Sequence, residues 1–419
     1  MSVNNLDAFL NARKQIKNAC ELFDNCKDDA NKYELISSPR RIIEVNIPVR
    51  MDDGNIKTFT GFRSQHNNAR GPFKWGIRFH QDVDISEVKA LSMWMTFKCA
   101  VIDIPLWGGK WWIIVNPKEL SKWELERLSR WYVRELYKYI WPEQDIPAPD
   151  VNTNPQIMAW MMDEYSELVW KYSPGSFTWK PLTSGGSKWR WAATAQGWVY
   201  VLEKILELKW DSISGKKVVI QWAWNAWLTM AILLVKLWAI IVWISDSKWW
   251  IYNEKWLFID KISRLKSERK SVIEYLDAEK LGAKEILEKK CDILIPAALE
   301  NQITATNAWN IDTKIILELA NWPITPDADE ILFEKNIPVI PDILANSGWV
   351  MVSYFEQVQN NTNFYWEEDE IDEKLHKKIT KAAIEVYEKS EEYNTKLRNW
   401  AYIVALKRVI DAMKDRGQL

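Results

Sequence analysis

Short apolar runs alternate with stretches of helical periodicity from about residue 182 onwards, and this alternation constrains the fold more than any other feature of the chain. A helical stretch at residues 228–237 follows the first of these runs. Such alternation is typical of a doubly wound parallel sheet, because parallel neighbours need a crossover connection, usually a helix. We therefore predict a doubly wound α/β domain over residues 182–345. Its predicted strands are residues 217–221, 239–245, 291–296, 314–319 and 337–341.

The first 181 residues mix strand and helix patterns and are predicted to form a separate α/β domain. Residues 41–49 and 57–62 have the pattern of two strands joined by a turn, and residues 122–140 that of an amphipathic helix. The proline-rich run 145–150 suits neither element, so we expect a loop or an extended connection there. The residues from about 346 onwards are mainly helical in pattern.

Composition excludes several classes of protein. The chain has 419 residues, of which 47% are hydrophobic and 27% charged, so intrinsic disorder is excluded. The 55 lysines and arginines nearly balance the 57 aspartates and glutamates, and a net charge of −2 gives no electrostatic basis for binding nucleic acid or an anionic membrane. The uncharged stretch 218–235 raises the question of a membrane span, but a strand followed by a helix explains it better.

Cysteine and histidine usage predicts neither a disulfide framework nor a metal site. The four cysteines form no CxxC pair, the three histidines are scattered, and no HExxH motif occurs. We therefore predict no bound metal and a reducing, cytoplasmic location. The N-terminal segment lacks the apolar core of a signal peptide and is expected to form an amphipathic helix.

A candidate nucleotide-binding loop follows the first strand of the second domain. Residues 222–227 lead from that strand into a helix and a second strand, which ends at Asp246. This spacing matches the GxGxxG fingerprint with its acidic residue about 20 positions on. Each glycine of the fingerprint is a tryptophan here (Trp222, Trp224 and Trp227), and an indole does not allow the close approach of a pyrophosphate. A buried βαβ unit that binds no nucleotide therefore stays an alternative.

Three lysines of the first domain stand in apolar or glycine-rich surroundings. Lys74 follows an RGPF sequence, Lys98 lies in an apolar helical stretch, and Lys110 follows two glycines. A lysine in such a setting is costly to bury unless it is paired or its pKa is lowered. The cluster suits an anionic substrate and an amine that takes part in proton transfer, although each lysine alone is equally well explained as exposed.

Five motifs resemble, in order and spacing, those of the glutamate dehydrogenase family. The resemblance extends from about residue 39 to near the C-terminus, and it implies two domains, an N-terminal α/β domain for substrate binding and oligomerisation and a Rossmann-like dinucleotide-binding domain. The motifs are KWGIRF at 74–79, PLWGGKWW at 105–112, IPAPD at 146–150, ELANWP at 318–323 and NSGWVMVSYFE at 346–356.

The resemblance assigns roles to five residues of the first domain and the C-terminal segment. Lys110 would be the catalytic lysine that assists attack of water on the iminium carbon, and Asp150 the general acid/base for the amino group. Lys98 would bind the α-carboxylate of the substrate. Lys74 and Ser353 would bind its γ-carboxylate, where the related leucine and phenylalanine dehydrogenases carry apolar residues.

In the second domain the resemblance implies a site for NAD or NADP. Asp246 is expected to accept a hydrogen bond from a ribose 2′-hydroxyl, which favours NAD, while Lys248 leaves use of NADP open. The family also implies a homohexamer built through the N-terminal domain, to which residues 346–419 would return. The implied cofactor contacts are Arg190, Thr194, Asn225, Asp246, Asn321 and Asn346.

Tryptophan stands at many positions where the family usually has glycine. The chain has 28 tryptophans and only 14 glycines, about half of the usual glycine share of about 7%. A left-handed non-glycine residue costs roughly 1–2 kcal/mol and overpacking about 1–3 kcal/mol, so these positions together would exceed a normal stability of about 5–15 kcal/mol. We hypothesise that most of them are glycine in the working protein, which an intact mass would test. They are Trp75, Trp107, Trp111, Trp112, Trp179, Trp189, Trp191, Trp222, Trp224, Trp227, Trp238, Trp249, Trp250, Trp322 and Trp349.

Three functional hypotheses follow from the sequence. The first is NAD(P)-dependent oxidative deamination of L-glutamate to 2-oxoglutarate and ammonium, with a small-molecule substrate and neither nucleic acid nor membrane as partner. The second is a catalytically inactive scaffold or binding protein of the same fold, in which tryptophan blocks the cofactor site. The third is a dehydrogenase of a branched-chain or aromatic amino acid, against which Lys74 and Ser353 argue.

Overall fold

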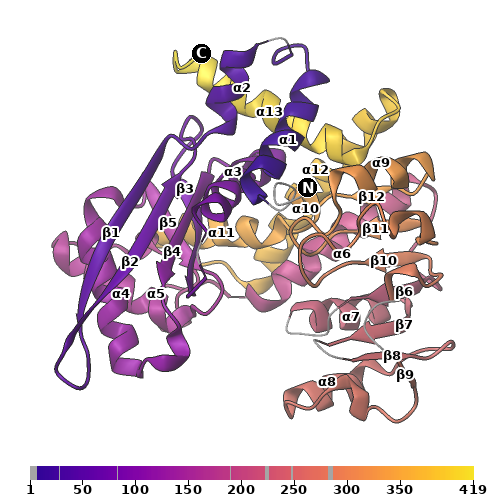
Figure 1. Ribbon diagram of the computed structural model, residues 1–419, viewed down its shortest axis with the longest axis horizontal. Helices are drawn as coiled ribbons and strands as arrows, with labels where there is room; N and C mark the ends of the chain where they lie inside the picture. The colour runs from indigo at the N-terminus through magenta and orange to yellow at the C-terminus, as the bar shows by residue number, and fades with distance from the viewer. Residues whose placement is uncertain are drawn as a thin grey trace. The chain divides into compact units, whose positions relative to one another are not determined.

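The chain forms two compact units in the computed structural model, which describes residues 7–27, 29–82, 84–188, 190–221, 226–246, 249–281 and 286–419. The first unit comprises Met1–Arg190, Val350–Ile371 and Tyr402–Leu419, and the second comprises Trp191–Trp349 and Asp372–Ala401. Each unit contains one sheet among the described residues (Figure 1). The C-terminal segment is thus shared between the two units.

The sheet of the first unit has the strand order β1-β2-β4-β3-β5. β1 and β2 form an antiparallel hairpin, β4 pairs antiparallel with β2 and parallel with β3, and β5 pairs parallel with β3. The two strands predicted around the early turn are confirmed by this hairpin. The strands are β1 (Arg41–Arg50), β2 (Ile56–Gln65), β3 (Phe73–His80), β4 (Trp107–Ile114) and β5 (Asp145–Pro149).

The prediction of a loop or connection at residues 145–150 is wrong for most of that run, since Asp145–Pro149 is the edge strand β5. The carbonyl of Pro147 accepts a hydrogen bond from Thr178 N at 3.0 Å. In a parallel ladder the backbone N and carbonyl O of one residue point to the same side of the strand. Because the carbonyl of Pro147 points to Thr178, its backbone N also points away from β3. A proline is tolerated there, because it removes no hydrogen bond of the ladder.

Helices of the first unit cover its sheet and begin at recognisable caps. Ser121 and Glu124 form a reciprocal capping box at the start of α4, and Asn154 caps α5 just before Pro155. Residues 90–101 of α3 are all buried, as expected for a helix that is apolar on every side. The helices are α1 (Ala8–Glu21), α2 (Ala30–Ser37), α3 (Ile85–Val101), α4 (Lys122–Leu136), α5 (Pro155–Leu168) and most of α11 (Gly348–Thr362).

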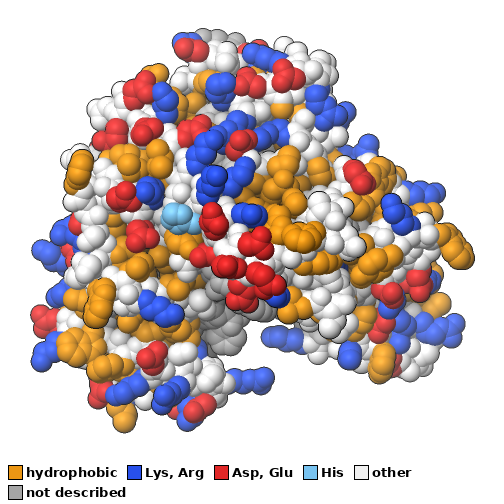
Figure 2. Space-filling model, turned by 180° about the vertical axis from the view of Figure 1, so that it is seen from behind, with side chains coloured by type: hydrophobic (Ala, Val, Ile, Leu, Met, Phe, Trp, Pro, Cys, Tyr) orange, Lys and Arg blue, Asp and Glu red, His pale blue; other side chains and the backbone are white. Residues whose placement is uncertain are grey.

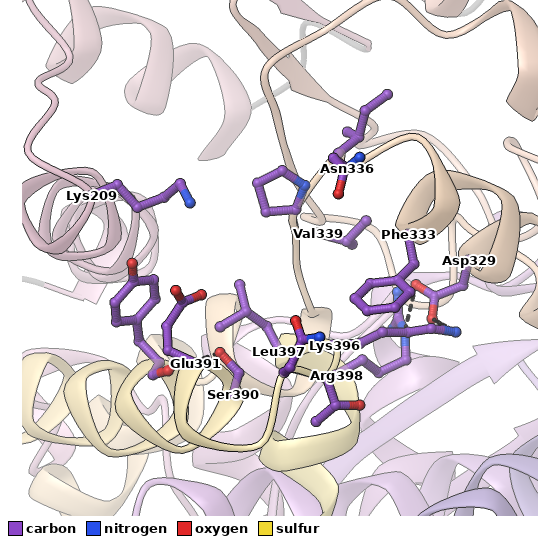
Figure 3. Close-up of a pocket in the computed structure, with 15 residues that line it drawn as sticks. Lys209, Asp329, Phe333, Asn336, Val339, Ser390, Glu391, Lys396, Leu397 and Arg398 are labelled. Atoms are coloured by element: carbon purple, nitrogen blue, oxygen red, sulfur yellow. Dashed lines mark hydrogen bonds and ion pairs between the residues drawn. The ribbon is translucent and has the colours of Figure 1, made fainter.

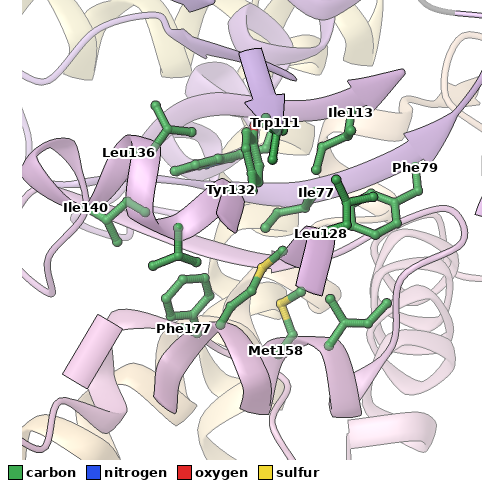
Figure 4. Packing of buried hydrophobic residues seen from close by; sticks show 14 of the residues in the cluster. Ile77, Phe79, Trp111, Ile113, Leu128, Tyr132, Leu136, Ile140, Met158 and Phe177 are labelled. Atoms are coloured by element: carbon green, nitrogen blue, oxygen red, sulfur yellow. The ribbon is translucent and has the colours of Figure 1, made fainter. Parts of the chain in front are cut away.

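A buried core joins the sheet of the first unit to α4 and α5. Figure 4 shows side chains of β3, β4, α4 and α5 pointing toward one another. Trp111 packs edge-on against Tyr132, with ring centroids 5.4 Å apart. The hydroxyl of Tyr132 donates a hydrogen bond to the carbonyl of Phe62 at 2.8 Å, which ties α4 to β2.

A disulfide joins Cys20 at the end of α1 to Cys26 in the turn that follows, and both residues are buried. The sequence did not predict this pairing, because six residues separate the two cysteines and no CxxC motif marks them. The amphipathic helix predicted near the N-terminus is confirmed as α1.

The sheet of the second unit has the order β12-β11-β10-β6-β7-β8-β9. The strands from β12 to β7 are parallel, which confirms the predicted doubly wound core, while β8 and β9 extend it as antiparallel strands. The strands are β6 (Lys217–Ile220), β7 (Ile240–Ser245), β8 (Trp250–Tyr252), β9 (Glu279–Leu281), β10 (Ile293–Ile295), β11 (Ile315–Leu317) and β12 (Val339–Ile340).

The helices that accompany this sheet include α7, which shares the uncharged stretch 218–235 with β6. Within the part of the chain that the structure describes, no helix is both long and apolar enough to cross a bilayer. The helices are α6 (Arg190–Leu208), α7 (Ala226–Lys236), α8 (Ile259–Ser267), α9 (Pro326–Glu334), α10 (Asp342–Ala345), α12 (Glu368–Glu392) and α13 (Leu397–Asp415), the last of which is shared with the first unit.

Several tryptophans have a backbone conformation that favours glycine. Helices α5, α6 and α7 each end in a Schellman turn with tryptophan at the left-handed position, where glycine is the usual residue. Three of the five tryptophans with positive φ were among the predicted glycine positions. The five are Trp170 (55°), Trp179 (66°), Trp210 (58°), Trp238 (65°) and Trp322 (58°).

Other tryptophans at predicted glycine positions lie in strands, and their indole nitrogens are buried. The indole N–H groups of Trp75, Trp107, Trp111 and Trp250 have no hydrogen-bond acceptor among the described residues. Burying an unsatisfied donor costs about 1–3 kcal/mol. Both observations support the hypothesis that glycine suits many of these positions better than tryptophan.

The surface carries charges of both signs. Figure 2 shows lysine, arginine and acidic side chains interspersed on the viewed face. This distribution agrees with the net charge of −2.

Candidate functional site

The predicted catalytic residues Lys110 and Asp150 and the predicted substrate-binding residue Lys74 lie on or directly after strands of one sheet. Lys74 is in β3, Lys110 in β4, and Asp150 directly follows β5, which pairs with β3. Lys98 lies on α3, which packs against β4. Residues that are 76 positions apart in the sequence thus come together because their strands are parallel neighbours.

Glycines allow this close approach. A Cβ at Gly76 would lie 2.5 Å from the Cβ of Asp150, so a side chain there would displace the carboxylate. A Cβ at Gly108 would collide with the carbonyl oxygen of Ser92 in α3. The glycines that the chain retains therefore permit both the approach of Asp150 to β3 and the packing of α3 on β4.

Lys110 and Asp150 form an ion pair in the site. The ammonium of Lys110 donates to Asp150 Oδ2, and Arg78 lies 3.6 Å from the same oxygen. Burial lowers the pKa of Lys110 to about 8, although the Asp150 carboxylate opposes this change. Burial favours the neutral form of Asp150, but the charges of Lys110 and Arg78 outweigh it and hold the Asp150 pKa below its usual range.

This arrangement gives the two groups complementary roles in proton transfer. Near neutral pH Lys110 is close to its pKa and can both donate and accept a proton, whereas Asp150 is a carboxylate that accepts one. The amide of Asp150 donates to the hydroxyl of Thr153 at 2.8 Å, which fixes the turn after β5.

Lys74 heads a second polar group in the first unit. Its ammonium donates to Thr178 Oγ1 at 2.7 Å and to the carbonyl of Ile146 at 3.3 Å. The hydroxyl of Thr178 also lies 2.7 Å from that of Ser353 on α11. All three side chains are buried, and burial lowers the pKa of Lys74 to about 7.

Thr178 was missed by the sequence analysis. It lies in none of the five motifs, and only its position before Trp179, one of the predicted glycine positions, pointed to this segment. The structure places it between the two residues predicted to bind the γ-carboxylate. An ammonium and two hydroxyls in a buried setting are suited to binding a carboxylate.

A buried ion pair supports the strands beneath these residues. Arg63 donates to Asp145 Oδ2 at 2.7 Å, and Gln65 donates to the same oxygen at 2.7 Å. Arg63 also lies over the ring of Trp111, with its guanidinium carbon 4.6 Å from the ring centroid. The pair links β2 to the edge strand β5, and the sequence analysis did not single out either residue.

Lys98 lies in the same electrostatic environment as Lys74. Both ammonium groups favour the thiolate form of the buried Cys99, whose pKa burial nonetheless raises to about 12. Lys98 is 4% exposed. All five predicted catalytic and substrate-binding residues thus lie in the first unit. Lys110 contacts Asp150, and Lys74 is linked through Thr178 to Ser353.

Two of the predicted cofactor residues, Asp246 and Asn321, follow the carboxyl ends of the parallel strands β7 and β11, while Thr194 lies on α6 and Asn346 follows α10. The strand order reverses between β6 and β10, which is the usual place for a nucleotide in such sheets. Asp246 follows β7, and its carboxylate accepts hydrogen bonds from Ser271 Oγ at 2.7 Å and Val272 N at 2.9 Å. Asn225 lies outside the described residues, and so does the side chain of Arg190.

Asn321 and Asn346 are brought together after β11 and α10. Asn346 Nδ2 donates to Asn321 Oδ1 at 3.3 Å. Asn346 Oδ1, Thr194 Oγ1 and Gln221 Oε1 are buried and have no hydrogen-bond partner among the described residues. Acceptors of this kind fit the ribose hydroxyls and the carboxamide of a nicotinamide dinucleotide, because a buried polar atom without a partner is costly. Gln221 was not predicted from the sequence.

A separate pocket of about 250 Å³ lies within the second unit and is lined by residues of α9, α12 and α13. Figure 3 shows Lys396 and Arg398 bonded to Asp329 at one end and Lys209 at the other. None of the predicted site residues lines it. Since its two cations at Asp329 are already paired, we assign the pocket no role.

Two family models match the chain. Residues 39–167 match the Glu/Leu/Phe/Val dehydrogenase dimerisation domain, and residues 185–417 match Glutamate/Leucine/Phenylalanine/Valine dehydrogenase. The NAD-specific glutamate dehydrogenase of Staphylococcus aureus (strain COL) is 48% identical over 389 residues, which cover 93% of this chain and 94% of that protein.

Solved structures give the same result. Glutamate dehydrogenase from Peptoniphilus asaccharolyticus is 40% identical with a TM-score of 0.87, covering 99% of this chain and 100% of that one. The hetero-hexameric glutamate dehydrogenase from Thermus thermophilus in its Leu bound form is 30% identical with a TM-score of 0.91, covering 99% and 98%. The predicted fold class is thereby confirmed. Because both halves match in the expected order and nearly the whole chain aligns with these relatives, the protein belongs to the Glu/Leu/Phe/Val dehydrogenase family.

Proposed function

We propose that the protein catalyses the reversible, NAD-dependent oxidative deamination of L-glutamate to 2-oxoglutarate and ammonium. The observation that carries this proposal is the buried group formed by Lys74, Thr178 and Ser353. An apolar substrate side chain placed against this group would leave a buried ammonium without an anionic partner, which is costly. Glutamate supplies that partner with its γ-carboxylate, whereas leucine and phenylalanine do not.

The proposed chemistry uses Lys110 and Asp150 in sequence. Asp150 takes a proton from the substrate ammonium. NAD, when bound, would supply the acceptor for the hydride of Cα. Lys110 then takes a proton from the water molecule that attacks the iminium carbon. The resulting Lys110 ammonium stabilises the carbinolamine. Asp150 returns its proton to the carbinolamine nitrogen, the C–N bond breaks, and the hydroxyl proton passes to the departing ammonia, so that ammonium and 2-oxoglutarate are released. Lys98 holds the α-carboxylate throughout.

The proposed cofactor site comprises Arg190, Thr194, Asn225, Asp246, Asn321 and Asn346, with NAD preferred. A carboxylate at the end of β7 accepts hydrogen bonds from ribose hydroxyls and repels a 2′-phosphate. The similarity to the NAD-specific enzyme of Staphylococcus aureus supports this preference. We also propose a homohexamer located in the cytoplasm, and the hetero-hexameric assembly of the Thermus thermophilus glutamate dehydrogenase supports the number of subunits.

The first experiment is glutamate-dependent reduction of NAD and of NADP by the purified protein, followed by absorbance, with leucine and phenylalanine as controls. Turnover with glutamate and NAD alone is the expected result. Folded protein that neither turns over glutamate nor shows saturable quenching of tryptophan fluorescence by NADH would instead favour the inactive scaffold. Sedimentation of the same sample tests the hexamer.

A further inference from the structure

A buried ion pair between Lys180 and Glu356 adjoins the residues that we propose to bind the γ-carboxylate, Lys74, Thr178 and Ser353. Lys180 Nζ donates to Glu356 Oε1 at 2.8 Å, and the two side chains are 0% and 1% exposed. Lys180 also donates to the carbonyl of Phe177 at 2.7 Å. The proposed mechanism uses neither residue.

Glu356 binds the backbone of the segment that carries Thr178. Its Oε2 accepts a hydrogen bond from Trp179 N at 2.9 Å, and its Oε1 accepts one from Lys180 N at 3.3 Å. The chain bends sharply here, because Trp179 has a φ of 66°. The Glu356 carboxylate therefore fixes the bend that begins at Thr178, and the hydroxyl of Thr178 accepts the hydrogen bond from Lys74.

The same helix supplies both anchors of this segment. Ser353 and Glu356 are three positions apart on α11, so they lie on the same face, one turn apart. Ser353 contacts the side chain of Thr178, and Glu356 contacts the backbone that follows it. Replacing a buried ion pair with apolar residues is often neutral or stabilising, so this pair is weak evidence for stability alone. Its distinctive contribution is to fix the bend relative to Ser353.

We propose, on the basis of the proposed function, that Glu356 and Lys180 are positioning residues for glutamate selectivity, because they fix the segment that holds Thr178 between Lys74 and Ser353. The titratable groups that face Lys74 are the charged side chains of Glu356 on α11, Arg63 on β2 and Asp145 on β5, and the neutral thiol of Cys99 on α3.

The charge of Glu356 also acts on Lys74 directly. Burial lowers the pKa of Lys74 to about 7, and Glu356 is the strongest of the charges that oppose this lowering. The carboxylate therefore extends the pH range in which Lys74 is an ammonium and can bind an anionic side chain.

The test compares the wild-type enzyme with Glu356→Gln and Glu356→Asp, using glutamate and norvaline as substrates from pH 6 to 9. Norvaline has the same chain length as glutamate but no γ-carboxylate. Glu356→Gln is expected to raise the KM for glutamate about tenfold, as for the loss of one buried charged hydrogen bond, while the KM for norvaline stays within about twofold. The pH above which the KM for glutamate rises should also decrease. Glu356→Asp keeps the charge but withdraws the oxygens, so it should raise the KM for glutamate without moving that pH.

Glu164→Gln is the matched control. Glu164 is a buried carboxylate of the same unit that pairs with Arg134 on α4. Within the described part of the chain, it forms no hydrogen bond or ion pair with Lys74, Thr178 or Ser353, the residues proposed to bind the γ-carboxylate. The Glu164→Gln change is expected to lower the melting temperature and leave KM and the pH profile unchanged. Equal changes for glutamate and norvaline in the Glu356 variants would overturn the inference. If Glu356→Gln does not fold, Glu356→Asp alone decides. A wild-type enzyme without glutamate turnover refutes the proposed function itself, whereas unchanged selectivity of active Glu356 variants refutes only this inference.

Discussion

The ammonium of Lys74 donates a hydrogen bond to the hydroxyl of Thr178 at 2.7 Å, although 104 positions separate the two residues. Thr178 thereby joins a strand of the sheet to the helix that carries Ser353. The γ-carboxylate of the proposed substrate would either replace one of these hydrogen bonds or accept additional ones from the same three side chains.

Replacing Thr178 with valine, which has nearly the same shape, removes this hydroxyl. We expect the KM for glutamate to rise about tenfold, because one hydrogen bond to a charged group is worth about 1.5–3 kcal/mol. Steady-state kinetics with glutamate and norvaline measure the effect, and the norvaline KM should change little. Thr58→Val on the exposed part of β2 is the control. A selectivity ratio that does not change would contradict the assignment of Thr178.

The pH dependence of kcat/KM follows from two lowered lysine pKa values. Lys74 must be protonated to bind glutamate, so activity is lost as pH rises through about 7. Lys110 must be deprotonated to accept a proton from water, so activity is lost as pH falls through about 8. A narrow bell-shaped profile centred between these values is therefore expected for glutamate.

Norvaline serves as the control for this profile. It does not need the Lys74 ammonium, so its kcat/KM should rise through about pH 8 and then stay level. A falling alkaline limb of the same shape with both substrates would show that another group causes it.

Asp150→Asn removes the proposed proton acceptor while keeping the size of the side chain. We expect kcat to fall by about 10²–10⁴-fold, the usual contribution of a general acid/base, with a smaller change in KM. Rapid-mixing and steady-state measurements of NADH formation report both values. Asp163→Asn, at an exposed position of α5, should be active. Near-normal turnover by Asp150→Asn would exclude its role in proton transfer.

Trp170→Gly, Trp210→Gly and Trp238→Gly should each stabilise the protein. All three positions are left-handed helix ends, and the indoles are 95%, 98% and 78% exposed, so little packing is lost. Relief of left-handed strain, less the greater entropy of unfolded glycine, predicts a gain of about 0.5–1 kcal/mol each. Thermal unfolding followed by circular dichroism measures the change. Trp123→Gly, at an exposed position in the first turn of α4, should destabilise instead. Destabilisation by Trp238→Gly, the position among these that the glycine hypothesis includes, would contradict that hypothesis there.

The sequence predicted most of the fold because its strands and helices have strong local patterns. It did not predict β3, β4, β8 or β9. It also did not predict β5, since proline in that run argues against a strand unless the outward side of the edge is known. Motifs also identified Lys74, Lys110 and Asp150, which the sheet brings together. Thr178 and Glu356 act through contacts that span more than 170 positions, and no local pattern marks such contacts.

The prolines of β5 have a consequence beyond the site. An edge strand with unpaired N–H groups is a template for another chain and a common origin of aggregation. Pro147 has no N–H to offer on the outward side, and its carbonyl is already bonded to Thr178. The edge strand that leads to Asp150 is thus poorly suited to pairing with a strand of another chain, and aggregation should not readily begin there.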